Sequence, residues 1–360
     1  MFESATEYLN FLRNLPFDFS AFETLRAESR TVVVSVGKSA AYMYEKFVSQ
    51  YPEAAHLPVF AVLPAGSERG ILKKENVVFS SHPHLTEKSF EAAEKLINFI
   101  KIHDPKNVIV LLSGGSSALI EKSKNEKEVV EINEMLLKSG LPITEINKKR
   151  GEYSLIKNGK LAEMFGSVDW FVFVASDIPF ENGEKFVGSM PFFREDLENT
   201  HLFKCADSDL LHDALLKQLP DNTESFRRFT ESVDDLKTLL LSRIEAGSEA
   251  VLITGEPLLK IGTKNAGRGG RMSHFALTML PFLKAGMKLF ALSSDGIDGN
   301  SPFAGSIVEG GLKIPGNEIA SALENYNSAE LLDKYGMTVK SGYTGLNLND
   351  FVIFLRKNRS

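Results

Sequence analysis

The sequence predicts an α/β protein built on parallel β-sheets. Continuous runs of Val, Ile, Leu and Phe alternate along the chain with segments of helical apolar spacing, a pattern typical of parallel strands covered by helices on both faces. The chain has 360 residues, and at roughly 100–200 residues per domain this length suggests two domains.

The first half of the chain supplies most of the expected strands. A helix is expected over 5–14, where Tyr8, Leu9, Phe11 and Leu12 have helical spacing. Strands are expected at 31–37, 58–66, 76–84, 107–112 and 168–177, with helices at 38–51 and 87–101 and a helix start after 113–117. The β-branched run "TVVVSVG" shows the signal most clearly, because it ends in a glycine before a helical pattern begins.

The second half repeats the alternation. Helices are expected at 233–247 and 269–283, and strands at 249–256, 287–296 and 349–357. The polar stretch 193–225 has no clear pattern, so the boundary falls between about 195 and 230. We expect an N-terminal domain over 1–205 and a C-terminal domain over 206–360.

Composition excludes several classes of function. The net charge of −6 provides no overall attraction to nucleic acid or to an anionic membrane. Cys205 is the single cysteine, so neither an internal disulfide nor a cysteine-based metal cluster can form. The N-terminal stretch lacks the pattern of a signal peptide, and no apolar run approaches the length of a membrane span. We expect a soluble, cytoplasmic protein.

Polar residues and glycines follow almost every expected strand. These segments are Gly37–Ser39, His82–His84, Ser113–Ser117, Ser176–Pro179, Thr254–Glu256, 262–271 and Ser294–Gly299. In open α/β sheets, ligands bind beyond the carboxyl ends of the strands. Backbone N–H groups, cations and carboxylates gathered there suit a phosphate and a divalent cation.

Each of these segments also has a purely structural interpretation. A glycine after a strand is usually a tight turn, and "VGKS" lacks the upstream glycine of a phosphate-binding P-loop. Asp295 and Asp298 could form a helix cap and a turn. His82 and His84 are more typical of structural histidines than of a metal site, because no third ligand is evident. The combined pattern is stronger than its parts, since all of it falls at strand ends.

Eight segments, in order, resemble a known family. They are "VGKSA", "SSHPHLTEKSFEAAEKL", "LLSGGSSAL", "INKKRGEYSLIKNGKLA", "VASDIP", "ITGEPLLKIGTKNAGRGGRMSHFAL", "ALSSDGIDGNSPFAGSIV" and "SGYTGLNLNDFVIFL". The chain is similar over about 5–357, except for the middle part 192–235, to the class II glycerate kinases, whose C-terminal part is called the MOFRL domain.

The resemblance implies two Rossmann-like domains with mostly parallel sheets and an active site in the inter-domain cleft. It implies ATP-dependent phosphorylation of a small hydroxy acid, D-glycerate to 2-phosphoglycerate, with Mg²⁺. The expected partners are thus a nucleotide and a small-molecule substrate, with no nucleic acid or membrane partner, and a homodimer is compatible with this. The implied catalytic residues are Lys38, Asp177, Arg271 and Asp295, of which Asp177 and Asp295 would bind the metal. The expected nucleotide-binding residues are Ser113, Gly114, Gly115, Ser116, Gly255, Glu256, Gly269 and Gly270, and the expected substrate-binding residues are Arg150 and Asp298.

The sequence departs from the family pattern in polar segments. The family's "RKHLS" is "RGEYS" at 150–154, "GGRNQE" is "GGRMSH" at 269–274, and "ASGPT" is "GSMPF" at 188–192. Replacing Lys-His by Gly151-Glu152 removes a cation and adds an anion, which predicts weak activity on D-glycerate. The alternatives are an altered-substrate or non-catalytic relative and, less favoured, a hydroxypyruvate reductase. A dinucleotide site would need three glycines after the first strand, where "SVGKSAAY" has one.

Overall fold

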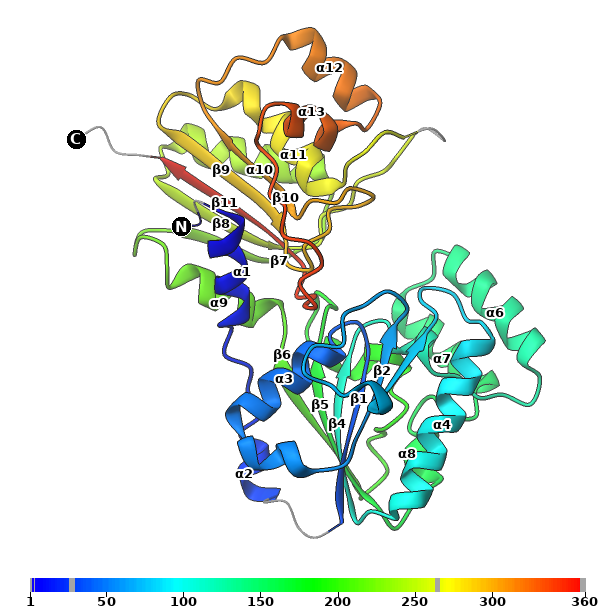
Figure 1. Cartoon of the computed structure of the whole chain (residues 1–360). Coiled ribbons are helices and arrows are strands. Elements are labelled where there is room, and N and C mark those ends of the chain that lie inside the picture. Colours follow the sequence, from blue (N-terminus) through cyan, green and yellow to red (C-terminus); the bar gives the residue numbers. More distant parts are fainter. Residues whose placement is uncertain (1, 3, 26–29, 263–265, 357–360) are drawn as a thin grey trace. The chain divides into compact units, whose positions relative to one another are not determined.

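The chain divides into two compact units. The computed structural model describes residues 2, 4–25, 30–262 and 266–356 (Figure 1). The first unit is Phe17–Asp207, and the second unit joins Met1–Pro16 to Ser208–Ser360. The expected N-terminal domain 1–205 therefore differs at its start, because the first sixteen residues pack in the second unit.

The first unit is built on a six-stranded parallel sheet. Its strands are β1 (Thr31–Val36), β2 (Val59–Pro64), β3 (Val77–Ser80), β4 (Asn107–Ser113), β5 (Asp169–Ala175) and β6 (Thr200–Ala206). The spatial order is β3-β2-β1-β4-β5-β6, and every neighbouring pair is parallel. In this arrangement the chain reverses its winding between β1 and β4, and ligands bind beyond the carboxyl ends of the strands at such a switch point.

The first unit also contains helices. They are α2 (Ala21–Leu25), α3 (Ala40–Gln50), α4 (Glu87–His103), α5 (Ser116–Leu119), α6 (Glu126–Lys138), α7 (Ile143–Tyr153) and α8 (Lys160–Glu163), with 3-10 turns at Pro52–His56, Lys74–Asn76 and Gly183–Ser189. Helix α4 begins at a capping box of Thr86 and Ser89. Its buried Leu96 and Ile100 join the core formed by the strands and Trp170.

The second unit has a mixed sheet. Its strands are β7 (Glu224–Phe229), β8 (Ala250–Gly255), β9 (Met287–Ser293), β10 (Gly305–Glu309) and β11 (Asp350–Arg356), in the order β10-β9-β11-β8-β7. Only β7 and β8 pair in parallel, whereas β11 is antiparallel to both β8 and β9, and β10 is antiparallel to β9. The expected α/β class is confirmed, but mostly parallel pairing is wrong for this unit. A strand buried on both faces is a continuous apolar run in either direction, so its pattern carries no signal of orientation.

Helices cover the second sheet as well. They are α1 (Ala5–Arg13), α9 (Ser208–Leu216), α10 (Val233–Ala246), α11 (Arg271–Met279), α12 (Gly316–Glu324) and α13 (Ser328–Lys334), with a 3-10 turn at Leu280–Phe282. Helix α1 lies beside β11, although the two come from opposite ends of the chain (Figure 1). The rings of Phe2 and Tyr8 pack against Phe351, with centroids 6.3 and 6.2 Å away. This aromatic contact is why the N-terminal segment belongs to the second unit.

The polar stretch without expected elements, 193–225, contains β6, α9 and the start of β7. β6 and β7 are edge strands with many partly exposed side chains, so they lack the apolar runs that mark the central strands. None of the helices among the described residues combines the length and the apolar character needed to cross a membrane.

Candidate functional site

Three predicted residues of the first unit meet at the carboxyl ends of adjacent strands. Lys38 follows β1, Gly114 follows β4 and Asp177 follows β5. The backbone N–H of Lys38 donates to the carbonyl oxygen of Gly114 at 2.9 Å. A Cβ atom at Gly114 would lie 2.3 Å from Oδ2 of Asp177, so the carboxylate packs directly on a backbone without a side chain.

His82, in the loop after β3, joins the same group. A Cβ atom at Gly115 would lie 2.9 Å from Cδ2 of His82 and 3.0 Å from Cγ of Lys38. Gly115 has φ +85°, a conformation that favours glycine. We refer to Lys38, His82, Gly114, Gly115 and Asp177 as the lysine–aspartate cluster.

The serines of "SGGSS" have structural surroundings. Ser113 and Ser116 are buried, and Oγ of Ser113 accepts a hydrogen bond from the backbone N–H of Ser39 at 3.0 Å. The sequence predicts that both bind nucleotide, but their buried hydroxyls face the protein. Helix α5, which begins at Ser116, has four residues. A single turn carries little of the dipole on which the expected anion site at a helix N-terminus depended.

Arg150, on α7, is directed toward the same loop. Its Nε donates to Oδ1 of Asn133 at 3.0 Å, and its Nη1 lies 3.4 Å from Oγ of Ser117, two residues beyond Gly115. Glu121 is buried nearby and forms an ion pair with Lys157, which is also buried. Burial lowers the pKa of the Arg150 guanidinium, and the Glu121 charge opposes that shift. This interaction favours the cation that the predicted substrate-binding role requires.

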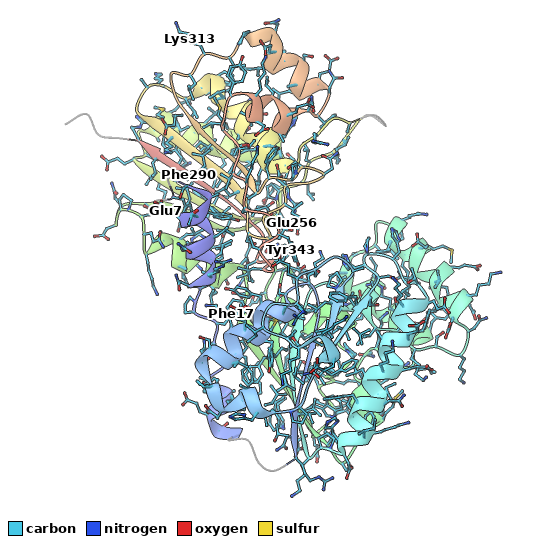
Figure 2. The ribbon with its side chains drawn as sticks, in the orientation of Figure 1. Glu7, Phe17, Glu256, Phe290, Lys313 and Tyr343 are labelled. Atoms are coloured by element: carbon cyan, nitrogen blue, oxygen red, sulfur yellow. The ribbon has the colours of Figure 1, made fainter. Side chains whose placement is uncertain are left out.

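In the second unit, Arg271 forms ion pairs with two carboxylates. Its Nη2 lies 2.8 Å from Oε1 of Glu256, and its Nε lies 2.5 Å from Oδ2 of Asp350. Glu256 is labelled in Figure 2, at the end of β8. The sequence predicts that Glu256 binds nucleotide, whereas in the structure it pairs with Arg271. We refer to Glu256, Arg271 and Asp350 as the arginine–carboxylate cluster.

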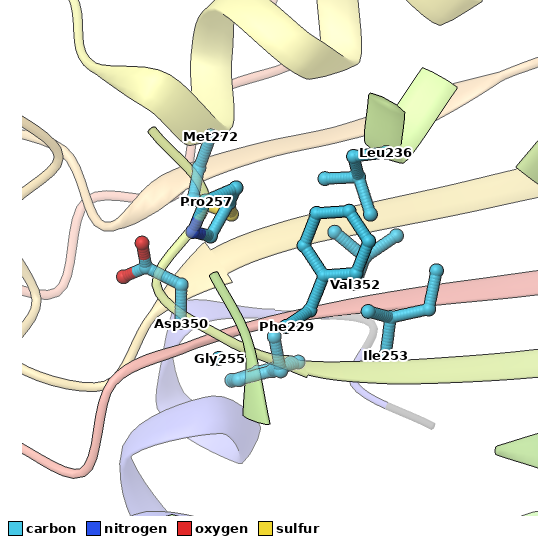
Figure 3. A pocket seen from close by; sticks show the side chains of 9 residues that line it. Phe229, Leu236, Ile253, Gly255, Pro257, Met272, Asp350 and Val352 are labelled. Atoms are coloured by element: carbon cyan, nitrogen blue, oxygen red, sulfur yellow. The ribbon is translucent and has the colours of Figure 1, made fainter. Parts of the chain in front are cut away.

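Asp350 is the residue that the sequence prediction missed. It is 2% exposed, and burial raises the pKa of its carboxyl to about 7, although the Arg271 charge lowers it. It borders a small pocket whose other side is apolar, formed by Phe229, Leu236 and Ile253 (Figure 3). The pocket volume open to water is about 10 Å³, room for about one water molecule and not for a substrate. The only signal in the sequence was an aspartate directly before the apolar run 351–355.

The two aspartates of "DGIDG" have separate partners. Oδ1 of Asp295 accepts from the backbone N–H of Ile297 and from Oγ of Ser293, both at 2.9 Å, so it closes a turn. Asp298 is buried and accepts from the backbone N–H groups of Met272 and Ser273, at 2.9 and 2.7 Å. Asp298 therefore caps α11, which matches the structural alternative of a cap and a turn and leaves its predicted substrate contact without support.

In this unit, the glycines that the sequence predicts to bind nucleotide lie against other atoms of the protein. A Cβ atom at Gly255 would lie 2.1 Å from the carbonyl oxygen of Phe229, and one at Gly270 would lie 2.2 Å from Oδ1 of Asp298. A Cβ atom at Gly269 would lie 3.2 Å from Oγ of Ser273. Thr263–Asn265 of the same segment lie outside the described residues.

Comparisons with known proteins agree with these features. A family model described as a domain of unknown function, DUF4147, matches residues 6–221, and the MOFRL family model matches residues 249–350. A glycerate 2-kinase from Sulfurisphaera tokodaii is 30% identical, and the match covers 90% of each chain. The chain belongs to the class II glycerate kinase family.

Two further relatives of this family member show its fold and its variety. The crystal structure of a glycerate kinase from Thermotoga maritima superposes with a TM-score of 0.84 over 98% of each chain, at 23% identity, and so shares the fold. A putative hydroxypyruvate reductase from Agrobacterium vitis is 23% identical over 90% of this chain and 87% of its own. Family membership confirms the expected enzyme class, a kinase-type phosphotransferase.

The carboxylates that the structure describes offer few ligands to the Mg²⁺ that this kinase family implies. The described residues contain no group of three or more His, Cys, Asp or Glu side chains arranged to hold a metal. Mg²⁺ needs fewer, because it keeps several waters and usually binds one or two carboxylates together with substrate phosphates. Asp177, packed on the bare backbone of Gly114, fits such a ligand in the first unit. Asp295 belongs to the second unit and keeps its half-buried carboxylate in a turn.

The residues that differ from the family pattern bring little charge to the site. Glu152 is exposed, so water screens its charge. Burial lowers the pKa of His274 below its ordinary value, so its ring is neutral at pH 7 and adds no positive charge where the family has a glutamate. Met190, at the family's glycine in "ASGPT", is buried with φ +44°. Screening of Glu152 thus weakens the expectation of weak activity on D-glycerate, which rested on this added anion and on the lost cation at Gly151.

Proposed function

We propose that this protein transfers the γ-phosphoryl group of ATP to the 2-hydroxyl of D-glycerate, giving 2-phosphoglycerate and ADP. The observation that carries the proposal is the lysine–aspartate cluster, which lies at the carboxyl ends of β1, β4 and β5 beside the switch point of the first sheet. The curated relatives named glycerate 2-kinase support the choice of substrate.

The reaction needs positioning and charge stabilisation more than covalent help from the protein. The hydroxyl oxygen attacks the γ-phosphorus, the bond from phosphorus to the β–γ bridging oxygen breaks, and the hydroxyl proton passes to a carboxylate. Lys38 provides a mobile point charge for the phosphoryl oxygens. Asp177 and Asp295 are the proposed carboxylates for Mg²⁺ and for the hydroxyl proton. The chemistry that bound Mg²⁺ supplies is neutralisation of phosphate charge.

Arg150 is the proposed contact for the substrate carboxylate. Its guanidinium is oriented by Asn133 and reaches Ser117 beside the glycine loop. A planar guanidinium can bind a carboxylate through two parallel hydrogen bonds. Arg271 is less suited to this task in the present arrangement, because its Nη2 and Nε already pair with Glu256 and Asp350. We propose that Arg271 serves the nucleotide side of the reaction.

A dinucleotide is not the expected cofactor. The turn after β1 contains Gly37 as its single glycine, where a dinucleotide-binding turn of this sheet type has three. Mg-ATP or Mg-ADP should raise the melting temperature, because a ligand that binds only the native state stabilises it. A clear shift with NADH and none with adenine nucleotides would instead favour the reductase activity.

The deciding experiment is a pair of steady-state assays. One couples ADP formation to a reporter with ATP, Mg²⁺ and D-glycerate, alongside a panel of other small hydroxy acids. The other follows NADH oxidation with hydroxypyruvate. We expect a kcat/KM for D-glycerate above about 10⁴ M⁻¹s⁻¹, the lower end for ordinary enzymes. A lower value together with a faster hydroxy acid would show an altered substrate, and no turnover of any would show a non-catalytic relative.

Two variants test the residues. Lys38→Met and Asp295→Asn should each lower turnover by about 10²–10³-fold. That loss corresponds to about 3–4 kcal/mol, similar to one charge interaction at about 4 Å near a protein surface. Both residues are half-buried in loops, so circular dichroism and melting should remain close to the wild type. Folded variants with turnover within a few-fold of the wild type would remove these residues from the mechanism.

A further inference from the structure

His82 lies in the loop after β3, in the segment His82–His84 that the sequence favoured as structural. Its ring faces the glycine loop: a Cβ atom at Gly115 would lie 3.0 Å from Nε2 of His82 and 3.0 Å from Cγ of Lys38. The imidazole and the lysine chain therefore flank the same bare piece of backbone. A ligand group seated on Gly115 would therefore lie beside the His82 ring and the aliphatic part of the Lys38 side chain.

The two histidines of this segment differ in their partners. Nδ1 of His84 lies 2.5 Å from Oε1 of Glu134, a hydrogen-bond contact on the surface that accounts for this residue. Among the described residues, no hydrogen bond holds either ring nitrogen of His82. The ring is nevertheless half-buried. A structural histidine in such a place usually has a hydrogen-bond partner, so the His82 ring nitrogens are available to a ligand.

The environment also decides which form of the ring is present. Burial, and then the charges of Lys38 and His84, lower the pKa of His82 to about 4. The ring is therefore neutral at pH 7 and a poor base, so it does not take the proton of the substrate hydroxyl. A neutral imidazole still carries one N–H donor. It can stabilise an anionic oxygen without adding a second positive charge next to Lys38, as a neutral histidine does in other active sites.

We propose that His82 is a catalytic residue that donates a hydrogen bond to an oxygen of the phosphoryl group held by Lys38. The inference rests on the proposed kinase function and deepens it, because it assigns a second contact to the group in transfer. In the transition state, negative charge is spread over the oxygens of the phosphoryl group in transfer. A preorganised donor aimed at such an oxygen typically contributes about 10²–10³-fold in rate.

Two substitutions and one control test this role. His82→Phe keeps a flat ring and removes the donor, and His82→Gln keeps an N–H donor on a flexible chain. The matched control is His84→Gln, two residues away. We expect His82→Phe to lower kcat by about 10²-fold, with a smaller change in KM for D-glycerate. His82→Gln should recover at least a tenth of wild-type kcat, and His84→Gln should stay within a few-fold of the wild type.

The outcomes distinguish a failure of the proposed kinase function from a failure of the role of His82. A wild-type protein that phosphorylates no hydroxy acid overturns the proposed function itself. An active wild type with a His82→Phe variant within a few-fold of its kcat overturns the role of His82 alone. Equal loss in the Phe and Gln variants, both folded by circular dichroism, would also overturn it, because packing rather than the donor would then be decisive. If His82→Phe does not fold, His82→Leu takes its place: a kcat at least tenfold below that of His82→Gln supports the role, and a kcat within a few-fold of it overturns the role.

Discussion

Replacing Gly114 by alanine places a methyl group where the Asp177 carboxylate lies. The new Cβ atom would be 2.3 Å from Oδ2 and 2.8 Å from both Cγ and Oδ1. Ordinary van der Waals contact begins at about 3.4 Å, so the nearest oxygen must move by about 1 Å. Asp177 is half-buried on a loop, and its side chain can move more easily than the backbone of β4.

The expected result is a large loss of rate with little loss of stability. Gly114 does not have a left-handed φ, so alanine fits the backbone conformation. Alanine also reduces the conformational entropy of the unfolded chain, which stabilises the folded protein by about 0.4–1 kcal/mol. A displacement of about 1 Å at a catalytic group can cost about 10²-fold in rate. We therefore expect kcat/KM for D-glycerate to fall by about 10²-fold, while the melting temperature changes by no more than a few degrees.

The coupled kinase assay and thermal melting measure these two effects. The control is Gly166→Ala, also in the first unit, where a Cβ atom would meet only the carbonyl oxygen of Glu163 at 3.9 Å. It should leave activity unchanged. If Gly114→Ala keeps kcat/KM within a few-fold of the wild type, either Asp177 is not catalytic or its position does not depend on this glycine, and the reasoning fails.

Three further experiments test the buried charges by chemical denaturation. In the folded protein the pKa of the Asp350 carboxyl is about 7, above the ordinary 3.8. This carboxyl therefore stabilises the fold fully below about pH 4, and its contribution falls by at most about 4 kcal/mol as the pH rises through 7. Asp350→Asn removes the titrating group, so the unfolding free energy should depend less on pH. Parallel curves for the two proteins would show that this carboxyl titrates normally. Lys157→Met leaves Glu121 buried without its cation and should lower the unfolding free energy by about 3–5 kcal/mol. Adding Glu121→Gln to this variant should restore at least half of the lost stability. If stability is not restored, packing and not charge is decisive. Asp298→Ala removes the acceptor for two N–H groups of α11 and should cost about 2 kcal/mol, so an unchanged midpoint would exclude the cap.

Parallel topology explains which parts of the site the sequence could predict. Lys38, Gly114 and Asp177 all follow apolar runs, and such runs end at one edge when strands are parallel. The search for polar residues after strands therefore found them. It could not show that Ser113 and Ser116 turn their hydroxyls inward, because that depends on the packing of neighbouring loops.

The same search missed Asp350 for a geometric reason. β11 is antiparallel to β8 and β9, so the beginning of β11 lies at the edge where those strands end. In the register of the sheet, Asp350 is opposite Gly255 on one side and Ser293 on the other. A residue that precedes its strand thus joins residues that follow theirs. Local sequence carries no sign of this reversal, nor of the contact between Tyr8 and Phe351.

The discontinuous second unit has a consequence for the order of events during synthesis. The first unit is contiguous, and its lysine–aspartate cluster is complete once residue 207 has left the ribosome. The second sheet cannot close until β11 is made, since this last strand lies between β8 and β9. At a translation rate of about 5–20 residues per second, roughly 20–70 s pass between the synthesis of α1 and that of the surface on which its segment packs, formed by Phe290 and Phe351. During that time Phe2 and Tyr8 lack the apolar surface on which they pack in the folded unit, and Arg271 cannot meet Asp350 until β11 has been made.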